Sequence, residues 1–431
     1  MNTYPSYKDS DIEWMGDIPE CWKLTKNRFG FRKHKNGLNE SDDTNVLSLT
    51  TTGVKVKRDL NFGKTSESYI GHQLVEQGDI VFTPRDFDQT PILSDVSKYK
   101  GCISNLYIVD KTKEDVLNRY VNYYWHGLKY SVDYFKNFSH GMRYSFNRFQ
   151  FDEIPLLIPP LQEQQQISDY LDYKTSKVDT LIEKTQQKIG LLKEQRTSLI
   201  NTTVTKGLNP DVDMKDSGVE WIGEIPSEWE VVKLKFVGKV IIGLSYSPDN
   251  VVDEGEGTLV MRSTNVQNGK PSFHDNVYVD KDIPDRMVTR EGDILICSRN
   301  GSRNLIGKNC IISKDIEGMS FGVFMTIFRS KYWKLIYWVL NSPVFKSQSG
   351  LYLTSTINQL TVSTIKNLTI PFTFNESEQE QIVDYLDNET SKIDKLVDTE
   401  TKRINLLKEY RQSLISEVVT GKVDVRDEVL V

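Results

Sequence analysis

The sequence predicts an α+β protein built from two tandem copies of one plan, each a strand-rich body followed by a long helix. Three observations predict this class: a repeated opening motif, short β-branched and aromatic runs in both bodies, and a repeated amphipathic segment that ends each copy. A chain of 431 residues is also too long for one ordinary domain. We therefore expect a first body at 1–158, a central helix at 159–207, a second body at 208–374, and a C-terminal helix with its tail at 375–431.

The repeat is visible at both ends of each copy and in one central motif. Residues 9–22 and 216–229 are identical at eight of 14 positions, and residues 167–207 match 382–422 at 21 of 41 positions without a gap. Gly78-Asp79-Ile80 recurs as Gly292-Asp293-Ile294. The segments between these motifs diverge much more. Two similar frames therefore carry two different bodies.

Within the bodies, runs of β-branched and aromatic residues alternate with Gly, Asn and Asp turns, which is typical of short strands. Two aromatic-rich segments favour helices instead. The predicted strands lie at 46–49, 80–83, 258–261 and 293–297, and the predicted helices at 119–128 and 332–340.

The closing segments are predicted as long helices because aliphatic residues recur at three- and four-residue steps in both copies. About 40 residues would give a rod of about 60 Å. Pro159-Pro160 precede the first helix, Asn375 with Glu378 forms a cap for the second, and Gly207 and Gly421 mark the two ends. The aliphatic positions are Ile167, Leu171, Val178, Leu181, Ile182, Ile189, Leu192 and Leu199, repeated as Ile382, Leu386, Ile393, Leu396, Val397, Ile404, Leu407 and Leu414.

A helix with one apolar face is not stable alone in water, so the two near-copies are expected to pair with each other as a coiled coil. The alternative is that each apolar stripe packs onto its own body.

Composition excludes several classes of protein. No basic-then-apolar leader opens the sequence, and the longest apolar run, 335–340, is far too short to span a membrane. The four cysteines are scattered, which suits a cytoplasmic protein without disulfides or a zinc site. The net charge of −6 does not favour nucleic acid, but an acid-free basic stretch runs from Lys23 to Lys35.

Catalytic motifs are absent as well. There is no phosphate-binding Gly-x₄-Gly-Lys-Ser/Thr loop, and the single Pro-Pro pair, Pro159-Pro160, is not followed by the aromatic residue that an amino-methyltransferase needs. No group of residues predicts a metal or catalytic site. The chain is therefore expected to be a binding component without a cofactor of its own.

Several motifs together resemble the specificity subunit of type I restriction-modification systems. They are the Trp-x-Gly-x-Ile-Pro opening, the Gly-Asp-Ile strand followed by an Arg-bearing tip, and Ile-Pro-Pro-Leu-x-Glu-Gln leading into a helix with Leu-Leu-Lys-Glu. The second copy departs from the pattern, since Ile370-Pro371-Phe372 replaces the double proline. The resemblance covers nearly the whole chain.

This resemblance implies that the two bodies are target-recognition domains for double-stranded DNA, separated by two helices that pack as an antiparallel coiled coil. It implies a bipartite, asymmetric target, read without catalysis by this chain. It further implies two modification subunits that use S-adenosylmethionine to methylate adenine, and two motor-nuclease subunits that use ATP and Mg²⁺.

Candidate DNA-binding residues follow from the side chains that read base edges and phosphates best. In each body, one candidate loop follows the Gly-Asp-Ile strand and another precedes the long helix; for any one residue the alternative is a polar turn. In the first body these are Arg85, Asp86, Gln89, Arg143 and Tyr144; in the second they are Arg299, Asn300, Ser302, Arg303, Thr354 and Ser355. Phosphate contacts, or a merely solvated face, are expected at Lys26, Arg28, Arg32, Lys33 and Lys35.

Two other functions compete with this interpretation. A stand-alone DNA adenine methyltransferase would need the motifs that are missing. A coiled-coil scaffold would explain the helices but not the repeated α+β bodies.

Overall fold

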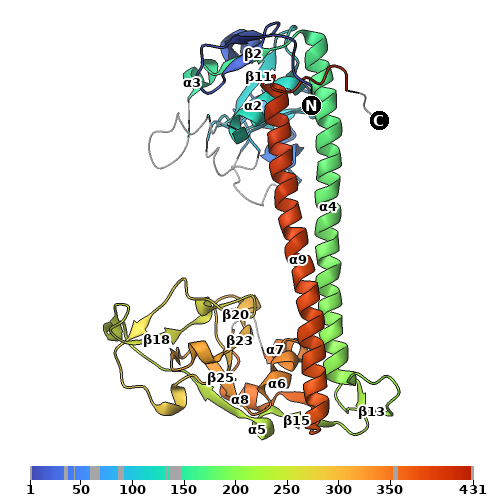
Figure 1. Ribbon diagram of the computed structural model, residues 1–431. Coiled ribbons are helices and arrows are strands. Elements are labelled where there is room, and N and C mark those ends of the chain that lie inside the picture. The colour runs from blue at the N-terminus through green and yellow to red at the C-terminus, as the bar shows by residue number, and fades with distance from the viewer. Residues whose placement is uncertain are drawn as a thin grey trace. The chain divides into compact units, whose positions relative to one another are not determined.

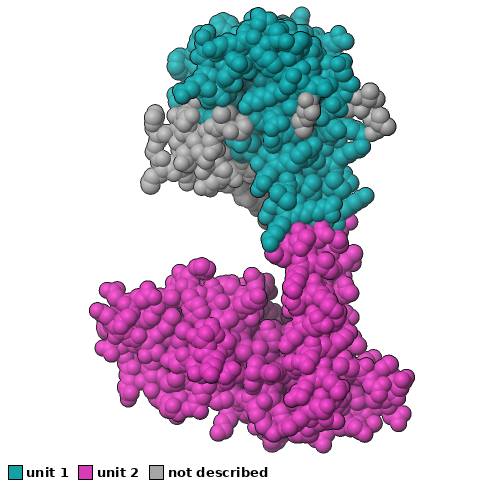
Figure 2. Space-filling model, in the orientation of Figure 1, with its two compact units in different colours: residues 1–186, 401–431 teal, residues 187–400 magenta. Residues whose placement is uncertain are grey.

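The computed structural model describes residues 2–33, 37–42, 44–58, 68–85, 92–131, 134, 145, 147–352 and 358–428. The chain forms two compact units, residues 1–186 with 401–431 and residues 187–400 (Figure 2). The boundary falls inside both long helices, so each unit holds one strand-rich body with one half of each helix. The predicted α+β class with two bodies and two long helices is confirmed. The four-part division of the chain stays a prediction.

The first body is built on an antiparallel four-stranded sheet with the order β4-β11-β8-β9, beside two-stranded pairs such as β5 with β6. The predicted strands at 46–49 and 80–83 correspond to β5 and β8, and the helix predicted at 119–128 is α2. The elements are β1 (Tyr7–Asp9), β2 (Asp17–Pro19), β3 (Lys23–Lys26), α1 (Asn27–Gly30), β4 (Phe31–Lys33), β5 (Leu47–Thr50), β6 (Gly53–Val56), β7 (Gln73–Val75), β8 (Ile80–Phe82), β9 (Ser94–Val96), β10 (Gly101–Ile103), β11 (Ile108–Thr112), α2 (Asn118–Ser131), α3 (Arg148–Asp152) and β12 (Pro155–Ile158).

An aromatic cluster fills the core of the first body. The Trp125 ring of α2 lies 5.0 Å from the Phe82 ring and 5.3 Å from the Phe151 ring, and all three side chains are fully buried. On the same helix, a Cβ at Gly127 would lie 2.5 Å from Val419 at the end of the last helix. The small residue therefore permits close packing of α2 onto that helix.

The second body repeats this sheet with the order β16-β25-β22-β23 and adds a second sheet, β17-β21-β18-β24, in which β18 and β24 are parallel. The strands predicted at 258–261 and 293–297 are β18 and β22, and the helix predicted at 332–340 is α6. The elements are β13 (Met214–Asp216), β14 (Glu224–Pro226), β15 (Glu230–Lys233), α5 (Leu234–Val237), β16 (Lys239–Ile242), β17 (Val251–Val252), β18 (Thr258–Met261), β19 (Val266–Gln267), β20 (Lys270–Pro271), β21 (Tyr278–Val279), β22 (Ile294–Cys297), β23 (Asn309–Ile311), β24 (Ser320–Phe321), β25 (Met325–Arg329), α6 (Trp333–Leu340), α7 (Pro343–Tyr352), α8 (Val362–Asn367) and β26 (Thr369–Phe372), with short 3-10 helices at Pro248–Asn250, Ser263–Asn265, Asp285–Met287, Arg303–Leu305 and Lys314–Ile316.

The repeated opening motif folds into the hairpins β1-β2 and β13-β14. Its final tryptophans, Trp22 and Trp229, are buried at 1% and 2% exposure. Its first tryptophans differ, because Trp14 packs against Tyr134 with 4.9 Å between ring centroids, whereas Trp221 is exposed. In both bodies the strand after the motif pairs with the strand that leads into a long helix, β3 with β12 and β15 with β26.

The two long helices are α4 (Leu161–Lys206) and α9 (Glu376–Val419), and they lie side by side (Figure 1). They run antiparallel, because in the second unit Lys188 contacts Glu400 while Arg196, further along α4, contacts Asp394, earlier in α9. Asn375 caps α9 as predicted, accepting the backbone N–H of Glu378 at 3.3 Å. In the part of the chain that the structure describes, no helix is both long and apolar enough to cross a membrane.

The ends of the predicted apolar stripe are fully buried where both helices meet a body. Ile167 and Leu171 share a core with Leu414 of α9 and with the first body, and Ile382 and Leu386 share one with Ile200 of α4 and with the second body. The repeat-equivalent pair Leu181 and Leu396 is different, being 43% and 48% exposed. The stripe is therefore wider than the seam between the two helices needs. A second repeat-equivalent pair, Leu191 and Leu406, is also exposed.

Candidate nucleic-acid interface

In each body, the described ends of the two candidate segments meet, and we call this point the tip. Arg85 forms an isolated β-bridge with Ser145, and Arg299 forms the equivalent bridge with Gln359. Each bridge joins the segment after the Gly-Asp-Ile strand to the segment before the closing helix. The sequence named both segments but could not show that they are neighbours.

The Gly-Asp-Ile motif itself is structural. Gly78 and Gly292 adopt left-handed φ angles of 90° and 81°, which glycine accommodates without strain. The Asp79 and Asp293 carboxylates then close the turn by accepting the backbone N–H three residues earlier, at 2.7 and 2.8 Å. The motif therefore fixes the start of the strand that carries each tip.

The tip of the second body borders a groove with a volume of about 1210 Å³. Its lining combines guanidinium groups and amides, which contact bases and phosphates, with two aromatic rings, of which Phe324 is exposed and Tyr246 half-buried. The lining includes Arg299, Asn300, Asn358, Gln359, Arg262, Ser263, Tyr246 and Phe324.

Of the residues that line this groove, Arg299 and Asn300 were predicted from the sequence, but Arg262 and Ser263 were not. A signal was present: Arg262-Ser263-Thr264-Asn265 directly follows β18, much as Arg299-Asn300-Gly301-Ser302 follows β22. The Asn300 amide joins the two segments by donating to Ser263 Oγ at 2.8 Å.

The predicted readers of the second tip have different surroundings. The Arg299 guanidinium is exposed and lies 5.0 Å from the centroid of the Phe324 ring, a cation–π distance. The Asn300 side chain accepts the backbone N–H of Ser302 at 2.9 Å, in addition to its bond to Ser263, so much of its amide is already used within the loop. Arg303 donates to the Gly350 carbonyl at 3.4 Å. Their roles in reading DNA stay predictions.

Three described cations of the basic stretch contact carboxylates. Lys26 and Arg28 both contact the Glu153 carboxylate, and Arg32 lies 3.1 Å from Glu114. Lys26 and Arg28 also hold the pKa of Glu153 below its usual value, chiefly through the Lys26 hydrogen bond. Acids distant in the sequence therefore neutralise much of a stretch that contains none itself. Lys33 contributes its backbone to β4.

The remaining predicted residues lie outside the described part of the chain. They are Lys35, Asp86, Gln89, Arg143, Tyr144, Thr354 and Ser355.

The type I restriction modification DNA specificity domain family matches residues 33–191 and 226–409, which is most of the chain. The chain belongs to this family. It is 25% identical over 452 aligned positions to a putative type I restriction enzyme MjaX specificity subunit of Methanocaldococcus jannaschii, covering 98% of this chain and 97% of that protein. It is 26% identical to the MjaVIII specificity subunit of the same organism, covering 76% of each.

A solved chain from a study of complex assembly and conformational transition of the type I R-M system has the same fold, with a TM-score of 0.65 at 17% identity, covering 94% of this chain and 99% of that one. The resemblance found in the sequence is confirmed. Specificity subunits are the non-catalytic DNA-recognition components of type I systems, and this chain is one of them.

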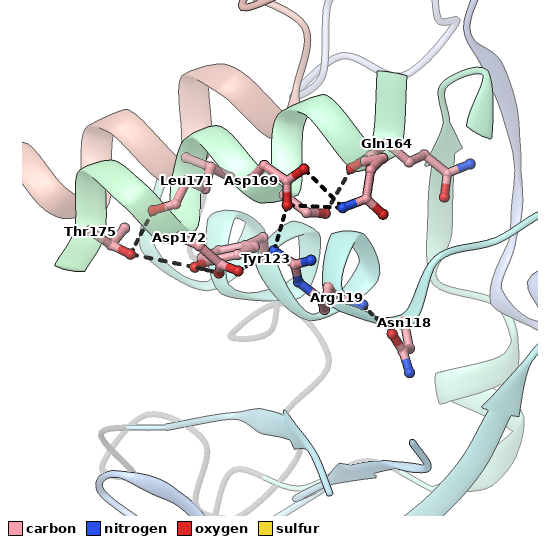
Figure 3. Close-up of polar contacts among 10 residues, drawn as sticks. Asn118, Arg119, Tyr123, Gln164, Asp169, Leu171, Asp172 and Thr175 are labelled. Carbon is pink, nitrogen blue, oxygen red and sulfur yellow. Dashed lines mark hydrogen bonds and ion pairs between the residues drawn. The ribbon is translucent and has the colours of Figure 1, made fainter. Parts of the chain in front are cut away.

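The first recognition body of this specificity subunit is fastened to α4 by a polar joint (Figure 3). Arg119 of α2 contacts both Asp169 and Asp172 of α4, and Tyr123 donates to Asp172 at 2.6 Å. Burial, followed by this hydrogen bond, raises the pKa of Tyr123, so the phenol stays protonated and remains a donor. The joint positions the body, and with it the tip, on the helix.

The second recognition body uses the same joint with other residues. The indole N–H of Trp338 in α6 donates at 3.1 Å to Asp387 of α9, which is the repeat equivalent of Asp172. Burial raises the pKa of Asp387. Both bodies of the specificity subunit are thus held to a helix by an aromatic donor and a helix carboxylate.

Proposed function

We propose that this specificity subunit reads a bipartite, asymmetric target in double-stranded DNA, one half-site with each body, and directs adenine methylation there. The observation that carries the proposal is the pair of repeat-equivalent tips, Arg85 with Ser145 and Arg299 with Gln359. The frames that hold these tips are alike, while the neighbouring residues differ. Two similar bodies whose tips carry different side chains suit two different half-sites.

The partners that we propose are two modification subunits, which would bind S-adenosylmethionine. For cleavage, motor-nuclease subunits using ATP and Mg²⁺ would join the complex in the cytoplasm. The exposed leucines support a ratio of two modification subunits per chain. Each unit presents one leucine from each helix, Leu181 with Leu406 and Leu396 with Leu191, and such apolar side chains on a helix face suit a protein interface.

Co-expression with the adenine methyltransferase of the source organism tests this ratio. Size-exclusion chromatography with mass measurement should give two modification subunits per chain. Leu181→Glu and Leu396→Glu should each remove one subunit, and the double variant both. Leu208→Glu changes a similarly exposed leucine outside the helices and should remove none. A chain that stays alone beside the methyltransferase contradicts the proposed assembly.

The two tips are tested by sequencing methylated adenines in the genome of the source organism. Arg299→Ala should reduce the base preference at one position of one half-site. For a bidentate contact with a base, the expected loss of discrimination is about 1–3 kcal/mol. Arg85→Ala should change only the other half-site, so each variant is the control for the other. If neither variant alters the methylated motif, the tips are not the reading elements.

A further inference from the structure

Arg262 lines the same groove as the tip residues Arg299 and Asn300. It directly follows β18 and is only partly exposed. Its Nη2 group contacts Asp275 twice, at 2.8 Å to the carboxylate Oδ1 and 3.2 Å to the backbone carbonyl. These contacts hold the guanidinium in one orientation at the groove. Fixing a flexible arginine in advance reduces the entropy lost when it binds a ligand.

The side chain of Asn265 holds the backbone around Arg262 and Asp275 in place. Asn265 is fully buried, accepts the Arg262 backbone N–H at 2.8 Å, and donates to the Ser272 carbonyl at 2.9 Å. It therefore ties the end of β18 to the loop that carries Asp275. Among the residues that the structure describes, the buried Arg262 Nε has no hydrogen-bond partner.

We propose that Arg262, braced by Asp275, reads a guanine in the half-site bound by the second body. This inference rests on the proposed function and adds a specificity-determining residue to it. A guanidinium can only donate, and the major-groove edge of guanine presents two acceptors, N7 and O6, with no donor beside them. The nearby Arg299 and Asn300 place this position in the same groove as the tip.

The Asp275 carboxylate favours a base over a phosphate. An arginine beside a carboxylate has little net charge to offer a phosphate, and it releases few counterions on binding. Nη2 is engaged by Asp275 and Nε is buried, so the N–H donors of Nη1 are the ones that remain, and the contacts of Nη2 fix their direction. Arg299 is different, since its partner is the neutral Phe324 ring, which leaves its charge uncompensated.

The test uses the complex of this chain with the source organism's adenine methyltransferase and a library of random double-stranded DNA. Wild type, Arg262→Ala, Arg262→Lys and Asp275→Asn are each used to select bound sequences. Arg262→Ala should reduce discrimination at one G·C pair of one half-site by roughly ten- to a hundredfold and leave the other half-site unchanged. Arg262→Lys should keep part of the preference. Asp275→Asn should weaken it at that same pair.

Arg286→Ala is the matched control, because Arg286 is exposed in the same body and does not line the groove. A melting temperature for each variant separates loss of reading from loss of folding, and Arg262→Lys and Asp275→Asn decide the matter if Arg262→Ala does not fold. An unchanged motif in a folded Arg262 variant overturns the inference and leaves the proposed function intact. If the Arg262 variants bind all DNA sequences more weakly by the same factor, and the slope of log affinity against log salt concentration falls by about one, Arg262 contacts a phosphate. That result also overturns the inference. A wild-type complex that selects no sequence overturns both.

Discussion

In the first unit, Glu163 in the first turn of α4 accepts hydrogen bonds from Trp22 at 2.9 Å and Tyr4 at 2.6 Å. In the second unit, Glu378 in the first turn of α9 accepts them from Trp229 at 3.0 Å and Thr373 at 2.7 Å. The tryptophans are repeat equivalents, but the second donors come from different places in the two bodies. A carboxylate shielded from water needs hydrogen-bond donors in the right geometry. Different parts of the chain can supply these donors in the two units.

The central sheets of the two bodies differ in the ion pair of the Gly-Asp-Ile aspartate. Asp293 at the start of β22 is paired with Arg329 through two bonds of 2.7 Å. The equivalent Asp79 lies 3.7 Å from Lys111, which occupies the position of Arg329 in the strand register. An arginine presents two parallel donors to a carboxylate, whereas a lysine presents a point charge. Asp293 in the second sheet therefore depends more on its ion pair than the equivalent Asp79 in the first.

The largest effect is expected at this ion pair. Arg329→Ala should destabilise the second body by about 3–5 kcal/mol, because it leaves the Asp293 carboxylate buried without its partner. Lys111→Ala removes a half-exposed and distant charge and should cost about 0–1 kcal/mol. Hydrogen exchange of β22 and β25, compared with β8 and β11, measures both. Equal losses in the two sheets would contradict the comparison.

The junction with the helix should respond next. Trp22→Phe removes a donor from Glu163, which is 4% exposed, and should cost about 1–3 kcal/mol. Trp229→Phe should cost less, because Glu378 is partly exposed and water can replace the lost donor. Scanning calorimetry of the full chain compares the two variants. A larger loss for Trp229→Phe would show that burial of the carboxylate does not decide the effect.

A smaller and pH-dependent difference is expected at His126. Burial lowers its pKa to about 4, from an ordinary value of 6.5, while its Nε2 lies 2.9 Å from the Ser94 carbonyl. Because the folded state disfavours the protonated ring, the contribution of His126 to the free energy of unfolding is fully present above pH 6.5. That contribution is lost as the pH falls from 6.5 toward 4.

His126 lies three residues after Tyr123, and Asn341, which does not titrate, lies three residues after Trp338, which makes the equivalent contact with the helix. A fall in pH from 7 toward 4 should therefore destabilise the first unit more than the second, and thermal unfolding at several pH values measures this. His126→Asn should remove part of that difference. A variant with an unchanged pH profile would assign the acid sensitivity to other groups.

The smallest effects should be equal in the two units. Arg411 donates to Asp179 in the first unit and Arg196 to Asp394 in the second, both at 2.8 Å between Nε and Oδ1. These pairs are largely solvent-accessible, so Arg411→Ala and Arg196→Ala should each cost about 0.2–1 kcal/mol, and less in high salt. Thermal unfolding at two salt concentrations measures this. Clearly unequal costs would mean that the two halves of the helix pair are not equivalent.

The repeat, the strand-rich bodies and the two long helices could be predicted from the sequence because each leaves a local or periodic pattern. The stripe from Ile167 to Leu199 shows its spacing within a single helix. The cap at Asn375 needs only three residues of sequence, and the structure confirms it. The resemblance to specificity subunits rests on the same short repeated motifs.

The site was predicted less completely because it depends on residues far apart in the chain. The basic stretch from Lys23 looked uncompensated, but Glu153, more than 120 residues later, binds both Lys26 and Arg28. Arg262 showed the same local pattern as Arg299, yet only folding brings both to one groove.

The architecture can be read from the amino-acid sequence: two related frames, two divergent bodies and two helices with matching apolar stripes. Folding adds which cations meet a carboxylate, which candidate segments meet at a tip, and which donors satisfy Glu163 and Glu378. The difference lies in the range over which each interaction acts. Helix periodicity and capping act over a few residues, whereas ion pairs and buried hydrogen bonds depend on distances in space that sequence separation does not reveal.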